Sequence, residues 1–484
     1  MSGGIMSEKK VKTPAQRILF FGMAMVIVFF ICFLPTPEGL TPEGQKALAL
    51  FVGIIFLWAT EPVPLAIVSL IMVPVVVGLQ IMTVPKALNN FSTSSIFLIV
   101  SALLMAPAMS KSGFAERLIY WLLSKVGCTA VRITLGITVA NIALAFIIPS
   151  TAARTAALLP ICISIIEIFK KNCGIPKDER SKFAVGLLLT LAFTNSIISA
   201  GILTATIPNP VTADFIFKAT GTKISYAEWF MYGFPPALIV TLFAWWLIKT
   251  VFKAEVNEIP GGKELVAEKL HSMGKMSSDE WKSCLIFLFV VLMWMTGSIT
   301  NIDTTIAAII GVCLMFLFGV INWSDAAKTS AFQFMLIMGG GFIIADLLIS
   351  TGAAKWVATS LFQLINVSGE VSILALLLIV IFIVQYMHIP FMGTTKMATM
   401  LIPIVISIAE AAHINPIILA MPAGMIISGF PLFLFFNTIS SLLVYGTNEM
   451  RMSDFPKVGI PICTVAVFVY SLMALTYWRW LGLF

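Results

Sequence analysis

The sequence predicts an all-α integral membrane protein with about eleven transmembrane helices and two re-entrant hairpins, arranged as two inverted repeats. Of its 484 residues, 59% are hydrophobic and 11% are charged, whereas soluble domains carry about 25% charged residues. A membrane-spanning helix needs about 20 mostly apolar residues. The apolar runs occupy most of the chain, so they leave no room for a soluble domain of ordinary size.

A series of apolar segments provides the predicted spans. They cover residues 17–34, 46–59, 63–80, 93–123, 131–167, 183–218, 227–252, 282–299, 304–321, 331–364, 371–409, 414–447 and 457–480. Several of them are too long to cross the hydrocarbon layer as a single straight helix. Because these long segments contain internal Pro, Gly, Thr and Asn, we expect them to be broken or re-entrant.

The basic residues decide which segments are hairpins. The net charge is +7, and the lysines and arginines cluster around residues 111–132, 170–182, 253–282 and 451–457. Positive charge accumulates on the cytoplasmic side of membrane proteins. All four clusters lie on one side only if residues 131–167 and 371–409 each enter and leave by the same face. Both segments are therefore predicted as re-entrant hairpins, with a cytoplasmic amino terminus and an outside carboxyl terminus.

The long polar stretch divides the chain into four parts. Residues 1–16 form a cytoplasmic segment, 17–252 the first membrane half with one hairpin, 253–282 a cytoplasmic linker, and 283–484 the second membrane half with the other hairpin. No signal-peptide cleavage site follows the first apolar run. The absence of additional domains favours a bacterial inner (plasma) membrane protein. Nucleic-acid binding is excluded because no soluble basic domain exists.

The two halves repeat each other. The paired strings are residues 110–115 with 349–354, 149–161 with 392–404, and 208–210 with 436–438, always in the same order. An odd number of membrane crossings separates equivalent points, so the copies have opposite topology. Inverted repeats are typical of secondary transporters, whose binding site lies between broken helices at the middle of the membrane.

Hydroxyl side chains stand at both predicted hairpin tips. They are Ser150 and Thr151 in the first hairpin and Thr394 and Thr395 in the second. A helix break exposes backbone amides and the positive end of the following helix, and both hold anions. A single hydroxyl more often bonds back to its own helix, but two matched clusters in inverted repeats favour an anion site.

Polar residues also interrupt the long segments after each hairpin. Pro208 and Asn209 stand in the first half, and Asn437 and Thr438 stand at the equivalent place in the second. Proline frees a carbonyl group, although Pro208 could equally be a simple kink. An unpaired amide in hydrocarbon is unfavourable, so the two asparagines predict polar contacts that close a binding site.

Three cations lie close to the hairpin tips rather than at the ends of spans. Arg154 follows the first tip, while His388 and Lys396 flank the second. Charged residues inside a membrane mark functional sites; the alternative is that the long side chains snorkel to the interface. Positive charge suits a substrate with two carboxylates and repels sodium. No catalytic set and no metal site is evident, so we expect neither an enzyme nor a bound metal, and no cofactor.

These residues resemble the divalent-anion:sodium symporter family of citrate, succinate and tartrate carriers, over about residues 17–482. Family members carry paired Ser-Asn-Thr motifs at the hairpin tips. Here the strings read Ser-Thr-Ala at 150–152 and Gly-Thr-Thr at 393–395, both without the Asn. Residues 206–209, Thr-Ile-Pro-Asn, resemble the family's Thr-Pro-Pro-Asn-like bend, and residues 435–438 resemble it more loosely.

The resemblance implies a homodimer in which scaffold spans form the interface and the hairpins belong to a moving transport domain. Sodium symporters of the family bind sodium at the two tips, where Arg154 and Lys396 stand here. The chain is therefore more similar to the sodium-independent exchangers of the family.

The sequence thus predicts a secondary active transporter that exchanges small di- or tricarboxylates by an elevator movement. Succinate, malate, 2-oxoglutarate, tartrate and citrate all carry suitable charge. The expected partners are these carboxylates, membrane lipid and a second copy of the chain. Sodium-coupled symport is the alternative within the same class, and an anion channel is the alternative from another class.

Overall fold

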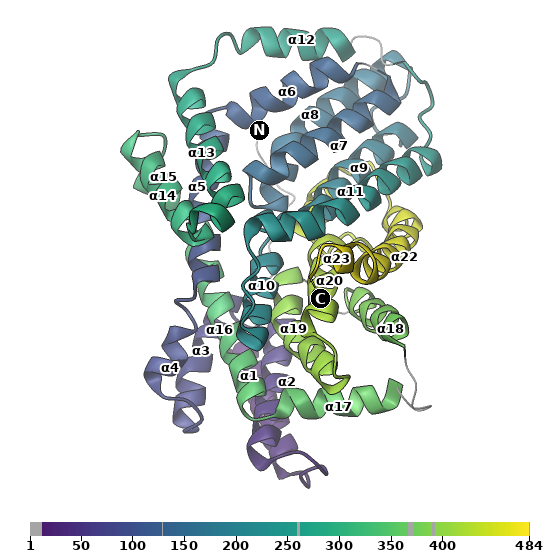
Figure 1. The fold of residues 1–484 in the computed structure, drawn as a ribbon. Helices are drawn as coiled ribbons and strands as arrows, with labels where there is room; N and C mark the ends of the chain where they lie inside the picture. The colour runs from purple at the N-terminus through teal and green to yellow at the C-terminus, as the bar shows by residue number, and fades with distance from the viewer. Residues whose placement is uncertain (1–11, 128, 259–261, 366–371, 390–392, 484) are drawn as a thin grey trace.

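The computed structural model describes residues 12–127, 129–258, 262–365, 372–389 and 393–483, and their regular secondary structure is helical (Figure 1). The helices of the first half are α1 (Pro14–Phe33), α2 (Pro42–Thr60), α3 (Leu65–Gly78), α4 (Val84–Asn89), α5 (Ser94–Lys111), α6 (Phe114–Val126), α7 (Ala130–Ile147), α8 (Thr151–Asn172), α9 (Lys182–Ser199), α10 (Pro208–Thr220) and α11 (Tyr226–Val251). The segment predicted as a linker contains α12 (Gly262–Ser272).

The second half repeats this order. Its helices are α13 (Ser278–Thr300), α14 (Thr304–Leu317), α15 (Trp323–Ala327), α16 (Ala331–Ser350), α17 (Ala353–Ile365), α18 (Ile373–Tyr386), α19 (Thr394–Ala411), α20 (Pro416–Gly429), α21 (Ile439–Tyr445), α22 (Asp454–Leu475) and α23 (Tyr477–Trp480). The run α5–α11 corresponds to α16–α22. The pairing across the halves is reciprocal, because α3 packs on α16 and the equivalent α14 packs on α5.

The predicted breaks are present in the long apolar segments. The segment 131–167 is the helical hairpin α7–α8, which turns at residues 148–150, and the segment 371–409 is the hairpin α18–α19. Residues 390–392 of the second turn lie outside the described residues. The segments 183–218 and 414–447 are interrupted at residues 200–207 and 430–438. The all-α fold class with paired hairpins is therefore confirmed.

The number of candidate spans agrees with the prediction, but their membership differs. In the described part of the chain, 11 helices are long and apolar enough to cross a membrane. They include the hairpin arms α7, α8 and α19, whereas α3, α14, α18 and α20 are shorter. The breaks explain the short length of α18 and α20, because they cut predicted spans into half-helices, whereas α3 and α14 contain no break and are short helices from end to end.

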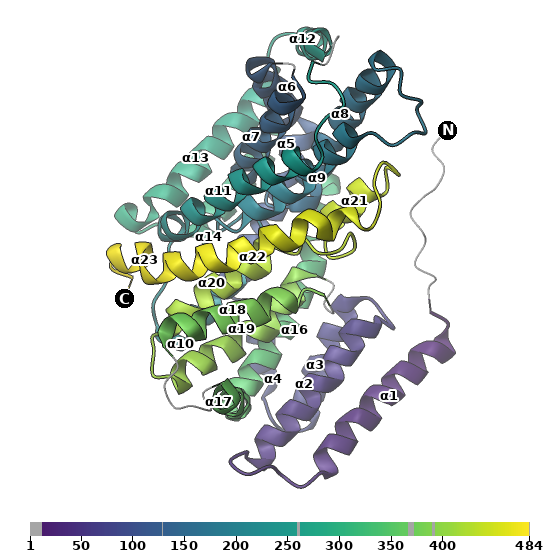
Figure 2. The same ribbon diagram turned by 90° about the vertical axis from the view of Figure 1, so that its right-hand side faces the viewer.

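The two helices that precede the breaks form the centre of the molecule. Of the 18 residues of α9, 94% are buried inside the protein. The equivalent α20 is buried from Ile417 to Gly429. These helices contact each other. Figure 2 shows α1, α2 and α3 on the side of the molecule away from α11 and α13. The breaks that follow α9 and α20 therefore begin inside the protein core.

Close backbone contacts hold the outer helices against this centre. Gly340 of α16 meets α3, where an added Cβ would lie 2.5 Å from the Cβ of Ser69. On the other side α12 packs on α6. Arg117 of α6 bonds the carbonyls of Met273 and Gly274 just after α12, and it forms an ion pair with Glu280 at 2.7 Å. The linker is thus folded onto the first half.

Candidate functional site

The first hairpin tip is held by α9. Ser150 is the N-cap of α8, and its hydroxyl accepts a hydrogen bond from the Ala153 amide at 3.3 Å. The amide of Asn195 donates to the Thr151 carbonyl and to the Thr155 hydroxyl, both at 2.8 Å. A side chain on the fully buried α9 therefore fixes the first turn of α8. The predicted hydroxyls of Ser150 and Thr151 stand at the positive end of this helix.

Arg154 lies behind this tip and is fully buried. Its Nη2 donates to the Ser199 hydroxyl at 2.5 Å and to the Ala205 carbonyl at 3.3 Å, so it bridges the hairpin to the first break. Among the described residues, its Nε and Nη1 atoms have no hydrogen-bond partner and no carboxylate forms an ion pair with it. A buried guanidinium with two unused donor groups has the chemistry that an anion-binding site requires.

The first break is stabilised by Asn209. Pro208 begins α10, where its missing amide hydrogen is not needed. The side-chain amide of Asn209 donates to the carbonyls of Ser199 and Ile202, both at 2.8 Å, and each of these carbonyls also accepts a tighter-turn hydrogen bond from the amide three residues on. The Oδ1 atom of Asn209 is buried without a partner. Asn209 therefore maintains the break and keeps one acceptor free.

The second hairpin tip leads into α19. Gly393, with φ of +98°, is the N-cap of this helix and, having no side chain, supplies no side-chain cap among the residues that the structure describes. Thr394 and Thr395 occupy its first two positions and are partly exposed. The first amides of a helix lack helical partners. The helix start thus has the amides and hydroxyls that bind anions at other helix N-termini, and the predicted role of Thr394 and Thr395 in binding stays a prediction.

His388 and Asn437 join the second hairpin to the second break. The Asn437 amide donates to the His388 carbonyl at 2.6 Å, and its oxygen accepts from the Leu434 amide at 2.8 Å. The His388 ring is buried between the carbonyls of Gln385 at 2.8 Å and Ile427 at 3.1 Å. Both residues are therefore engaged in holding the break. Their predicted contact with a substrate stays a prediction.

Thr438 has a local role in this arrangement. Its hydroxyl caps α21 by accepting a hydrogen bond from the Ser441 amide at 3.1 Å. The same hydroxyl lies 3.1 Å from the Ser441 hydroxyl. The predicted substrate contact of Thr438 also stays a prediction, because both interactions serve the helix start.

Lys396 lies beside the second tip, where its Cε is 3.9 Å from the position of a Cβ added to Gly393. Its ammonium group lies 3.0 Å from a carboxylate oxygen of Glu61, the residue that follows α2, and 3.2 Å from the Trp58 carbonyl of α2. Its side chain is 12% exposed. In this conformation the charge of Lys396 is therefore compensated by Glu61, in contrast to that of Arg154.

The packing crosses the two repeats. The second arm of the first hairpin, α8, contacts α21, which follows the second break, and α19 contacts α10, which follows the first. Each hairpin is thus bonded to the break of its own half, and its second arm packs against the helix after the other break.

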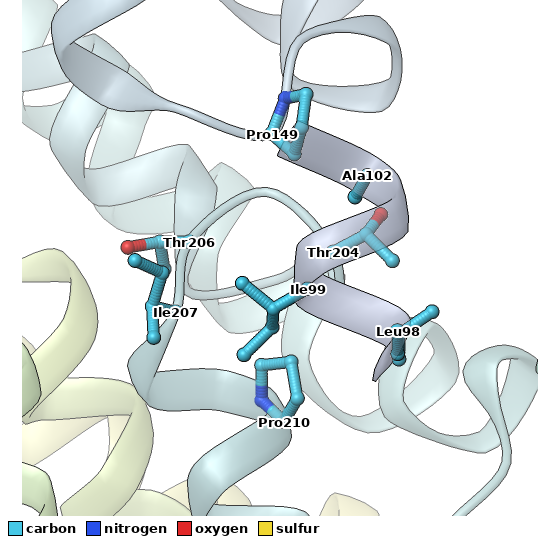
Figure 3. Close-up of a pocket in the computed structure, with 8 residues that line it drawn as sticks. All are labelled: Leu98, Ile99, Ala102, Pro149, Thr204, Thr206, Ile207 and Pro210. Carbon is cyan, nitrogen blue, oxygen red and sulfur yellow. The ribbon is translucent and has the colours of Figure 1, made fainter. Parts of the chain in front are cut away.

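A narrow cavity marks the first half of this region (Figure 3). Pro149 of the hairpin tip, Thr204, Thr206 and Ile207 of the break, and Leu98 of α5 line it, together with Ile99, Ala102 and Pro210. Its volume is about 10 Å³, which is the space of a single water molecule. A neighbouring cavity of about 310 Å³ shares Leu98 and Pro210 with it. A dicarboxylate would therefore need α5 and the break to separate.

Sequence reasoning missed two partners of this site. Ser199 receives the Arg154 hydrogen bond, and Glu61 pairs with Lys396. Both residues are far from the tips in the sequence, and neither belongs to a repeated string. A buried cation requires a polar partner. The sequence contains many serines and glutamates, and nothing in its pattern indicates which of them contacts a given cation.

Comparisons with known proteins are consistent across the whole chain. A family model described as the sodium:sulfate symporter transmembrane region matches residues 15–484. A protein of Cupriavidus necator described only as a membrane protein is 28% identical, with 97% of this chain and 94% of that protein aligned. The sodium-dependent dicarboxylate transporter SdcS of Staphylococcus saprophyticus is 26% identical over 96% of this chain and 92% of SdcS. The putative malate transporter YflS of Bacillus subtilis is 24% identical over 99% of both chains.

Two solved transporter structures share the fold. The YdaH transporter of Alcanivorax borkumensis superposes with a TM-score of 0.54 at 11% identity, over 96% of each chain. MtrF of Neisseria gonorrhoeae superposes with a TM-score of 0.58 at 11% identity, over 96% of this chain and 95% of MtrF. At this level of identity the likeness concerns the fold alone.

Proposed function

Since the chain belongs to the sodium:sulfate symporter transmembrane family, we propose that it is a secondary active carrier that exchanges small dicarboxylates. The protein is a multi-pass membrane transporter and not an enzyme. The names of SdcS and YflS support a dicarboxylate substrate. Two carboxylates match the two helix N-termini in number, one at each hairpin tip.

The observation that carries the proposal is the uncompensated charge of Arg154. Burying a lone cation costs several kcal/mol even after the protein relaxes. Arg154 is fully buried, and its Nε and Nη1 atoms have no partner. A carboxylate can accept a charge-assisted hydrogen bond from either of these free guanidinium groups. Substrate binding would thus offset a penalty that the empty protein bears.

The same charge supports exchange over symport. An elevator movement carries the hairpins through the membrane, where an unpaired charge is unfavourable. The empty carrier would move with Arg154 uncompensated, whereas the loaded carrier would not. The return step is therefore favoured only with a second substrate bound. A fixed cation beside the first tip also repels sodium.

Each predicted site residue has a role in this proposal. Ser150 and Thr151 bind one carboxylate with Arg154, and Thr394 and Thr395 bind the other with the first amides of α19. The remaining predicted residues, Pro208, Asn209, Asn437, Thr438 and His388, keep the two breaks in shape. Lys396 becomes a second substrate cation when the movement separates it from Glu61, which lies on the static side.

Elevator movement, dimerisation and location are part of the proposal. The two hairpins, α9–α11 and α20–α22 form the moving unit. The helices α1–α3, α13, α14 and α16 form the scaffold and the homodimer interface. The carrier resides in a bacterial inner membrane, with the segment containing α12 on the cytoplasmic side. No cofactor is required.

Sodium-coupled symport is the second candidate, because relatives carry the description sodium-dependent. Purified protein in vesicles, with labelled succinate outside, separates the two. Exchange predicts uptake only into vesicles preloaded with dicarboxylate, and equal uptake when choline replaces sodium. Strict sodium dependence would overturn exchange in favour of symport. Uptake that needs neither sodium nor internal substrate would show a channel. Competition by malate, 2-oxoglutarate, tartrate and citrate then ranks the substrates.

A further inference from the structure

A cavity of about 370 Å³ lies outside the candidate site, where one end of α7, α9 and α11 come together. These three helices contact one another and lie side by side in Figure 1. The wall is formed by the first turn of α7, by Phe183 and Gly186 of α9, by Lys249 of α11, and by Lys253 and Asn257 beyond it. Its lining therefore combines an apolar floor with cations.

The cations of this cavity are not neutralised within the protein. Lys249 and Lys253 form no ion pair among the described residues, although many other lysines of the chain do. The nearby carboxylate of Glu255 is occupied at the start of α9, where it accepts hydrogen bonds from the Ser181 hydroxyl at 3.1 Å and from the Phe183 amide at 3.2 Å. The amino group of Lys457 lies 5.4 Å from the ring of Phe252, another wall residue. The described residues that line the cavity thus include two cations and no carboxylate.

The cavity stands at the level of a membrane surface. Lys249 ends the 26-residue helix α11, and its amino group lies 4.1 Å from the centre of the Trp245 ring. Tryptophan and lysine at the end of a long apolar helix mark the border between lipid tails and headgroups. Trp246 and Leu242 on the same helix are 49% and 44% exposed, so an apolar outer face leads up to the cavity.

From this combination we infer that the cavity binds the headgroup of an anionic phospholipid. Basic pockets between membrane helices on the cytoplasmic side recognise such headgroups. The phosphate lies between Lys249 and Lys253, and the acyl chains follow the exposed face of α11. The α7 helix starts at the cavity, where the Ala130 amide donates to the Asn257 carbonyl at 2.8 Å. The bound lipid therefore ties the base of the first hairpin to α11.

The binding test uses full-length protein in detergent and does not depend on transport. Dihexanoyl-phosphatidylglycerol is titrated while the melting temperature is followed, with dihexanoyl-phosphatidylcholine and inorganic phosphate as comparison probes. We expect the anionic lipid alone to raise the melting temperature. Each lysine near an anionic lipid surface contributes about 1 kcal/mol, so K249Q/K253Q is expected to weaken the apparent affinity by about 30-fold.

The matched control is K269Q/K275Q, which removes two exposed lysines of the predicted linker and should keep the wild-type response. An equal response of K249Q/K253Q and wild type would overturn the inference, since the lipid would then act elsewhere. An equal effect of inorganic phosphate would also overturn it, because the site would recognise a free anion. Misfolding of K249Q/K253Q is detected by its melting temperature in phosphatidylcholine, which should equal that of wild type.

Discussion

Replacing Arg154 by methionine removes the charge of the first hairpin tip and keeps most of the side-chain volume. In the structure Nη2 is held by Ser199 and Ala205, whereas Nε and Nη1 are buried without partners. If one of these two groups donates to a substrate carboxylate, the hydrogen bond to the charged group contributes about 1.5–3 kcal/mol. R154M should then weaken succinate binding by about 1.5–3 kcal/mol, a factor of about 10–10².

The melting temperature of R154M distinguishes a substrate-binding role of Arg154 from a structural role. Breaking a compensated buried ion pair typically destabilises a protein by about 3–5 kcal/mol, whereas an apolar replacement of buried charge is often neutral or stabilising. Because Arg154 has no carboxylate partner among the described residues, R154M should melt at or above the wild-type temperature while it loses exchange.

The assay measures succinate binding by titration calorimetry and exchange in preloaded vesicles, with melting temperature on the same samples. R154K serves as a control that keeps the charge but loses the planar fork, so it should bind more tightly than R154M and more weakly than wild type. Wild-type affinity in R154M would refute the reasoning, as would a loss of exchange that is accompanied by a large fall in melting temperature.

Three further predictions concern the surroundings of the site. Asn437→Ala leaves a hairpin carbonyl and a backbone amide without partners, so unfolding free energy should fall by about 2–4 kcal/mol; an unchanged melting temperature would show that water replaces the amide. Gly340→Ala places a methyl group 2.5 Å from the Cβ of Ser69 and should destabilise the fold by about 1–3 kcal/mol. Thermal melting checks this against Gly78→Ala, a variant of an exposed helical glycine with open space around it, which should keep the wild-type melting temperature; an equal fall in both variants would contradict the packing argument. Burial of Asp303 opposes its ionisation, but the Lys223 ammonium and the Thr305 groups outweigh it and hold the pKa of this carboxyl below its usual value. A lowered pKa stabilises the fold at pH values above the unfolded pKa of about 4, and this stabilisation is lost as the pH falls through the folded pKa. The melting temperatures of wild type and Asp303→Asn should therefore differ at about pH 6 and converge below about pH 4. A difference that stays constant with pH would contradict the assignment.

Much of the fold could be predicted because the membrane restricts the choices. Apolar runs must be helical, and a run that is too long must break where Pro, Gly or polar residues allow it. The positions of the breaks near Ser150, Pro208 and Gly393 follow from this rule. The exact limits of the spans do not follow from this rule. The half-helices α18 and α20 are shorter than a full crossing, and only packing against neighbouring helices makes them stable.

The candidate site was predicted at the level of residues and less well at the level of contacts. Arg154 is buried beside the first break, as its position near a tip suggested, and its empty donors distinguish it from a structural arginine. Asn437 looked similar in sequence to Asn209, yet both ends of its side chain bond the backbone, whereas the Asn209 oxygen is free. Burial alone predicts that an amide needs partners and does not say which ones.

The sequence by itself determined the class of protein, the two inverted halves, the hairpins and the positions of charge near their tips, because hydrophobicity and helix breaking are local properties. Only the tertiary structure decided where those charges point. Lys396 and Glu61 are 335 residues apart and form an ion pair, while Arg154 meets Ser199 and retains unpartnered donors. A long flexible side chain takes its direction from the partner that folding brings within reach, and that partner is set by helix packing across the chain.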